Sequence, residues 1–152
     1  QRETVVLQRL NGSHPVQVLS PPGSRRNASG TAMGRALLSR LSEAEFQALY
    51  GTDAAQPLPM EGRDCPATVG DLARLVAQTR ADHCGVAIDQ AMPGIGAVAA
   101  AVRDPATGEL RGLCLSFVSF QADAARVARL RESVLQQVAA LGRALNDPYW
   151  ST

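Results

Sequence analysis

The spacing of apolar and polar positions changes along this chain, and the changes separate strands from helices. Residues 4–10 (TVVLQRL) are rich in β-branched and apolar side chains. Asn11-Gly12 is a tight-turn dipeptide, and residues 15–19 (PVQVL) resume the extended pattern, so the opening predicts a β-hairpin. Residues 20–27 contain two prolines, a glycine and polar side chains. We expect an irregular loop there.

Helical spacing begins after this loop. Apolar residues recur every three or four positions over residues 31–41, and Ser29 or Thr31 is placed to cap the first free backbone amides. Residues 42–45 (SEAE) form a capping box, in which a serine and a glutamate each satisfy a backbone amide of the first turn. We therefore expect a helix over 31–41 and a second, short helix that ends near Gly51.

The middle of the chain leads from helices to further strands. Residues 52–66 contain prolines and a glycine without any period, which predicts a long surface connection. A third helix is expected to start at Thr68 and to stop before His83. Three extended segments follow, at residues 84–90, 95–103 and 110–119. Between the last two, residues 104–109 (DPATGE) have the composition of a hairpin turn.

The final part of the chain decides the fold class. The alanine run at residues 97–101 suits a helix on propensity alone, but its length and flanking turns favour a strand. Apolar residues keep a helical spacing over 123–145, with Asp123 near the start of the expected helix. The order of two strands, three helices, three strands and one helix describes an α+β domain. We expect an antiparallel sheet of about five or six strands, flanked by helices.

Length and composition agree with a single domain over residues 1–152. An apolar fraction of 45% and a charged fraction of 19% argue against a disordered chain and a coiled coil. The 15 basic residues, all arginine, nearly balance the 14 acidic ones, and a net charge of +1 gives no broad surface for nucleic acid or membrane. Residues 1–20 lack the order of a secretory signal, and no apolar stretch is long enough to span a bilayer. We therefore expect a cytoplasmic protein.

Residues with catalytic or metal-binding chemistry are few and scattered. Cys65, Cys84 and Cys114 are an odd number of cysteines at wide spacings, which suits reduced thiols better than disulfides. The two histidines stand at no recognised ligand spacing, although a zinc site from Asp64, Cys65, His83 and Cys84 is conceivable. No nucleophile elbow or zinc-protease motif is present. We predict no catalytic residue, no metal and no cofactor.

Two segments could hold a ligand, and each also has a purely structural explanation. Residues 27–34 (NASGTAMG) place small side chains at a helix start, where free amides and the positive end of the helix dipole favour a carboxylate or phosphate. A closely packed, capped helix explains the same residues. In the strand at 113–117, alternation puts Cys114 and Ser116 on one face. They line a pocket or simply fill the second side of the sheet.

Two further positions can be ligand-binding or purely structural. Ala97 shares one strand face with Ala99 and Ala101, and these small side chains either admit a helix closely or leave space for a small molecule. Asp89 ends an extended segment before Pro93-Gly94. It is a turn residue by default, because most carboxylates are exposed, but in a pocket it could accept from ligand hydroxyls.

The order and spacing of several segments resemble the effector-binding domain of IclR-type bacterial transcription regulators along nearly the whole chain. These segments are residues 27–38, 41–45, 85–89, 93–104 and 112–116. The resemblance implies a GAF/PAS-like sheet with helices, a small organic-acid effector held in its cavity, and self-association as a dimer or tetramer. It also implies a winged helix-turn-helix DNA reader on the N-terminal side of this region. That reader is missing here, so we expect either an excised fragment or a stand-alone sensor.

Carried over residue by residue, the resemblance implies a ligand site between the sheet and the amino end of the 31–41 helix. Its members are Thr31, Ala32, Met33, Asp89, Met92, Ala97, Cys114 and Ser116. The amides of Ala32 and Met33 would hold the effector carboxylate, and Asp89 would contact its polar end. Cys114 and Ser116 would supply hydrogen-bonding groups.

This sequence departs from the family pattern after Asp89, where Ala91 and Met92 replace the usual acidic pair. Met92 would then add apolar wall beside Ala97, so the expected effector is a partly apolar or aromatic carboxylate. Its binding would shift the population of subunit arrangements, with a coupling free energy of about 1–3 kcal/mol. Two alternatives are a GAF-like thiol enzyme that uses Cys84 or Cys114, and a purely structural dimerisation module.

Overall fold

The computed structural model describes residues 2–12, 17–18, 20–62 and 64–151, which form four α-helices and five strands in two antiparallel sheets. The strands are β1 (Glu3–Val5), β2 (Arg25–Asn27), β3 (Gly85–Ile88), β4 (Ile95–Arg103) and β5 (Leu110–Val118). The helices are α1 (Ala32–Leu38), α2 (Glu43–Tyr50), α3 (Val69–Asp82) and α4 (Ala124–Ala144), with 3-10 turns η1 (Ser119–Gln121) and η2 (Pro148–Trp150). None of the described helices is long and apolar enough to cross a membrane.

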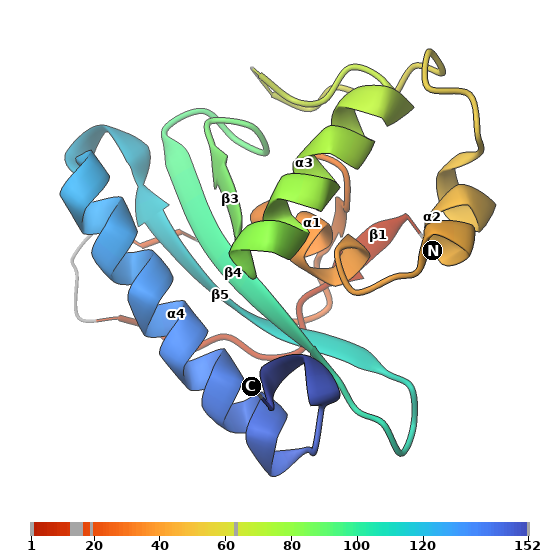
Figure 1. Cartoon of the computed structure of the whole chain (residues 1–152). Helices are drawn as coiled ribbons and strands as arrows, with labels where there is room; N and C mark the ends of the chain where they lie inside the picture. Colours follow the sequence, from red (N-terminus) through yellow and green to blue (C-terminus); the bar gives the residue numbers. More distant parts are fainter. Residues whose placement is uncertain (1, 13–16, 19, 63, 152) are drawn as a thin grey trace.

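The main sheet has the order β3-β4-β5 and separates two helical layers. Figure 1 shows α4 lying along one face of the sheet, while α1 and α3 lie on the other side. Every second residue of β4 points to the α4 side, so Val98 and Val102 pack with Val134 and Val138 of that helix. The alanine run is therefore a strand, as predicted. The α+β architecture is confirmed as well.

Side-chain caps start the helices where the sequence places them. Thr31 accepts from the amide of Gly34, and Ser42 forms the expected capping box with Glu45. Thr68 begins α3 with a second capping box, and Asp123 caps α4. These local hydrogen bonds satisfy amides that have no partner inside the helix, which is why the starts of the helices could be predicted from the sequence.

The first helix is shorter than the predicted range of 31–41. It ends at Leu38, and the amides of Arg40 and Leu41 bond to carbonyls three residues back, which tightens the chain into a turn before α2. The apolar spacing continues through this turn, so periodicity alone did not reveal the end of the helix.

The predicted N-terminal hairpin is wrong in its pairing. β1 pairs with Arg25–Asn27, a segment that we expected to be irregular, and not with residues 15–19. Residues 15, 16 and 19 lie outside the described part of the chain, and residues 17–18 form no strand. The two prolines at 21 and 22 precede β2, so its own amides remain free to pair. The strands therefore form one sheet of two strands and one of three. The main sheet is smaller than the single sheet of five or six strands that we expected.

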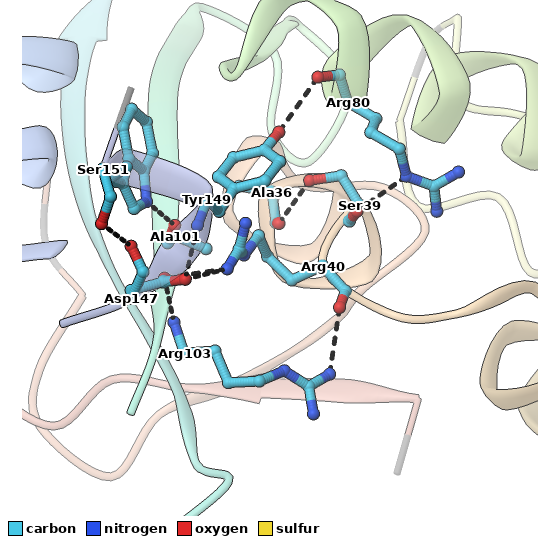
Figure 2. A network of polar contacts seen from close by, with 10 residues as sticks. Ala36, Ser39, Arg40, Arg80, Ala101, Arg103, Asp147, Tyr149 and Ser151 are labelled. Atoms are coloured by element: carbon cyan, nitrogen blue, oxygen red, sulfur yellow. Dashed lines mark hydrogen bonds and ion pairs between the residues drawn. The ribbon is translucent and has the colours of Figure 1, made fainter. Parts of the chain in front are cut away.

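A buried polar network fixes the C-terminal segment against β4 and the turn that follows α1 (Figure 2). The Asp147 side chain is 1% exposed and accepts from Arg40 Nη2 at 2.7 and 2.8 Å and from the Arg103 amide at 2.9 Å. Trp150 donates from Nε1 to the Ala101 carbonyl at 3.0 Å. The last turn of the chain is thus joined to the centre of the domain.

Candidate functional site

The α1-facing side of the sheet is lined by small residues, and α1 packs directly onto it. Ala32 and Ala36 of the helix form one buried cluster with Ala87, Ala99 and Ala101 of the strands. A Cβ added to Gly85 would lie 2.4 Å from the Ala32 carbonyl oxygen, too close for any side chain. The small residues beneath α1 therefore serve close helix packing. The side chains of α1 and of the strands therefore fill the space between Ala32 and the sheet.

The same sheet face remains open on β5, beyond the cover of α1. Register pairs Ala97 with Ser116 and Ala99 with Cys114, so these side chains share the face, as alternation predicted. Ala97 is half-buried, whereas Cys114 and Ser116 are exposed, with 4.0 Å between Sγ and Oγ. Met33 overlies the neighbouring strand position, since a Cβ on Gly112 would lie 2.8 Å from its sulfur. We call Ala97, Cys114 and Ser116 the β5 shelf.

Asp89 holds together the turn between β3 and β4. Its Oδ1 accepts from the Gly94 amide at 2.7 Å and from the Ser119 hydroxyl at 2.8 Å, and its backbone has a positive φ of 57°. These contacts give Asp89 the turn role that we named as its default. Met92 stands in this turn with 41% of its surface exposed. The turn joins the strands at the same end of the sheet as Ser116, because Gly96 pairs with Phe117.

Arg35 is the polar residue of this region that the sequence analysis missed. It is 2% exposed, and its Nη2 donates to Gln90 Oε1 at 2.5 Å, which ties α1 to the Asp89 turn. Its Nε is buried without a hydrogen-bond partner among the described residues. Burial lowers the pKa of Arg35 to about 10. The available signal was a single arginine within the small and apolar run AMGRALL.

Cys84 and Cys114 do not have the environment of nucleophiles. Cys84 is buried, and burial raises the pKa of its thiol. Cys114 is exposed at the surface, yet desolvation against the sheet raises the pKa of its thiol too, and the Ser116 hydroxyl opposes only part of this. A reactive cysteine needs a lowered pKa, so neither residue has the environment of a catalytic thiol. No group of three or more His, Cys, Asp or Glu residues with metal-site geometry occurs in the described part of the chain.

Two hollows lie away from the eight predicted site residues. One, of about 240 Å³, is bordered by β1, α1 and the start of β5, and its lining is mostly leucine, including Leu37 and Leu110. The other, of about 500 Å³, lies between the end of α3, the C-terminal half of α4 and η2. The predicted site is thus an open shelf beside α1 and the Asp89 turn, and its ligand role stays a prediction.

Comparisons with known proteins assign this arrangement to a family. The family described as "Bacterial transcriptional regulator IclR C-terminal" matches residues 1–143. The HTH-type transcriptional regulator XynR of Escherichia coli (strain K12) is 29% identical over 150 residues, which are 97% of this chain and 57% of XynR. The chain therefore spans little more than half the length of this relative.

Solved structures show the same fold. The Agobacterium tumefaciens repressor BlcR aligns with a TM-score of 0.72 and 27% identity over 83% of this chain and 50% of its own. The Thermotoga maritima IclR aligns with a TM-score of 0.84 and 17% identity over 95% of this chain and 57% of its own. These proteins and the matching family are transcriptional regulators, not enzymes. This chain belongs to the IclR family of bacterial transcriptional regulators, in which it forms the C-terminal effector-binding domain.

Proposed function

We propose that the domain senses a small organic acid at the β5 shelf and that binding of this acid controls the regulator's DNA-binding part allosterically. The observation that carries the proposal is the presence of exposed polar side chains beside a turn at one end of the sheet. The shelf exposes Cys114 and Ser116, and the Asp89 turn lies at the same end of the sheet, where Asp89 bonds Ser119 just after β5.

The proposed roles follow from the donors and acceptors that remain available. Thr31 uses its oxygens for the amides of Gly34 and Arg35, so the Ala32 and Met33 amides remain for a ligand carboxylate. Cys114 and Ser116 would bond the polar part of the ligand. Its apolar part would lie on Ala97 and on the exposed side chain of Met92. Asp89 would act through Oδ2, because Oδ1 accepts the hydrogen bonds from the Gly94 amide and the Ser119 hydroxyl.

A thermal-shift experiment tests the site. Acetate, pyruvate and benzoate represent small carboxylates of increasing apolar area. A ligand at one hundred times its dissociation constant adds about 2.7 kcal/mol to the free energy of unfolding, which raises the Tm of a domain this size by about 5–10 °C. Ser116→Ala should reduce the shift, whereas Ser133→Ala, a matched change on the exposed face of α4, should leave it unchanged. A Tm that no carboxylate moves would favour the purely structural dimerisation module.

We further propose that the domain self-associates as a dimer or tetramer and works in the cytoplasm, where a regulator meets DNA. A ligand that prefers one arrangement of subunits shifts the equilibrium between arrangements by its difference in affinity. Light scattering after gel filtration, with and without the stabilising acid, measures that shift. A monomer at every concentration and in every ligand state would contradict this mechanism.

A further inference from the structure

The larger of the two hollows lies outside the proposed effector site. Its volume of about 500 Å³ falls in the range of small-molecule sites, and it opens between the end of α3, the last turns of α4 and η2. The lining combines aromatic, aliphatic and polar groups, contributed by Asp82, His83, Leu135, Gln136, Ala139, Arg143, Tyr149 and Trp150. The β5 shelf shares none of these residues.

One wall of the hollow is a cluster of three rings. The His83 ring lies 4.6 Å from that of Tyr149 and 5.5 Å from that of Trp150, and the Tyr149 and Trp150 rings meet edge to face at 5.4 Å. His83 is exposed and has a left-handed backbone with φ 56°, in the position that ends α3. The exposed His83 and the half-buried Tyr149 offer ring surface to a flat aromatic ligand, whereas Trp150 is only 8% exposed.

Hydrogen bonds and close packing hold the Tyr149 and Trp150 rings of this wall in place. Asp147 caps η2 by accepting from the Tyr149 amide, and the Tyr149 hydroxyl donates to the Arg80 carbonyl at 3.0 Å (Figure 2). The Arg40 guanidinium lies 3.6 Å from the centre of the Tyr149 ring. Gly142 of α4 admits the indole, because a Cβ there would lie 2.4 Å from Trp150 Cδ1. Rings fixed before binding lose little entropy when a ligand arrives, which favours recognition.

The polar groups of the hollow favour a negative ligand. Arg143 is exposed in the last turn of α4 and makes no ion pair with the residues that the structure describes. Asp82, the acidic member of the lining, is already paired with Arg131 at 3.3 Å and accepts from Gln78 at 2.9 Å. The cation is therefore available, whereas the carboxylate is largely neutralised.

We propose that this hollow is a second ligand site, which takes a small planar aromatic carboxylate with its ring against the wall and its carboxylate on Arg143. Aromatic surface beside an unneutralised guanidinium favours this occupant, because the guanidinium can donate two parallel hydrogen bonds to a carboxylate. The site lies outside the proposed effector site and does not depend on it.

Trp150 makes the test direct, because it is the single tryptophan of the chain and lines the hollow. Benzoate is titrated against the emission of Trp150, and benzamide serves as a probe of the same shape without charge. We expect a saturable change with benzoate and weaker binding of benzamide. Arg143→Gln should weaken benzoate binding about threefold to fivefold. His83→Asn, which removes the ring but suits the left-handed backbone, should weaken it at least about twofold.

Matched variants distinguish binding in this hollow from binding elsewhere on the domain. Arg126→Gln removes another exposed charge of α4 and should change nothing, because that residue lies at the opposite end of the helix. Ser116→Ala should likewise leave the Trp150 signal intact. The proposal is overturned by the absence of saturation, by equal binding of benzoate to Arg143→Gln, or by a signal that depends on Ser116. A signal that follows protein concentration instead of benzoate would assign the hollow to a second copy of the chain and overturn it too.

Discussion

Replacing Asp147 by alanine should be among the most damaging single changes in this domain. The carboxylate is 1% exposed and forms an ion pair with Arg40, whose side chain is 8% exposed. It also accepts from the amides of Arg103 and Tyr149. Removal leaves a buried guanidinium without its counter-charge, and the Nε of Arg40 already has no described partner.

The magnitude follows from the kind of pair that is broken. Removing one partner of a buried ion pair costs about 3–5 kcal/mol, because the remaining charge stays desolvated. A domain of this type is stable by about 5–15 kcal/mol in total, so Asp147→Ala should remove about a fifth or more of the free energy of unfolding. At about 2–4 °C per kcal/mol, the Tm should fall by roughly 6–20 °C.

Urea unfolding followed by far-ultraviolet circular dichroism measures the loss without relying on Trp150, which is close to the mutation. Arg40→Met and the double variant complete a cycle, in which the double variant should be destabilised by less than the sum of the single changes. Arg111→Ala provides the surface control, because Arg111 and Glu109 form an exposed pair and should contribute at most about 1 kcal/mol. A loss below about 1 kcal/mol for Asp147→Ala, or strict additivity in the cycle, would refute the reasoning.

Three further predictions use other parts of the structure. Gly85→Ala should destabilise the domain by about 1–3 kcal/mol in urea unfolding, because its Cβ would meet the Ala32 carbonyl oxygen at 2.4 Å; an unchanged midpoint would contradict the close packing of α1. The Ser42 amide holds the pKa of Glu45 below its usual 4.5, so this stabilisation exists above that value and is lost as the pH falls through the lowered folded pKa. The Tm difference between the native protein and Glu45→Gln should therefore shrink on acidification, and a constant difference would argue against the cap. Iodoacetamide should modify exposed Cys114 before buried Cys84, as measured by mass spectrometry. The reaction of Cys114 should be faster at alkaline pH, because the pKa of its thiol is raised. Equal rates for the two thiols would contradict the difference in their burial.

The local elements of this domain could be predicted well because their signals are local. Capping residues such as Ser42 and Thr68 bond to amides three residues away, so the helix starts are written in adjacent positions of the sequence. The β4-β5 hairpin turn is equally local, since the Asp104 carboxylate and carbonyl bond within residues 104–109. The alternation that puts Cys114 and Ser116 on one face also needed only the period of a strand.

Pairings between distant segments could not be predicted in the same way. The composition of residues 20–27 suggested a loop, yet Arg25–Asn27 pairs with β1, because strand pairing depends on which backbone groups meet in space. The burial of Arg35 depends on the placement of Gln90, 55 positions later in the chain. The hollow beside Trp150 unites the end of α3 with α4 and η2, and no spacing in the sequence indicates that meeting.

The sequence by itself determined the class of fold, most helix and strand positions and the family, because these depend on short-range hydrogen bonding, periodicity and the order of motifs. Only the tertiary structure decided that α1 fills the space beneath it, that the β5 shelf remains open and that Asp147 and Arg40 are buried together. Burial and contact between remote side chains result from how the layers pack. Their consequences for charge and ligand access therefore appear only once the layers are assembled.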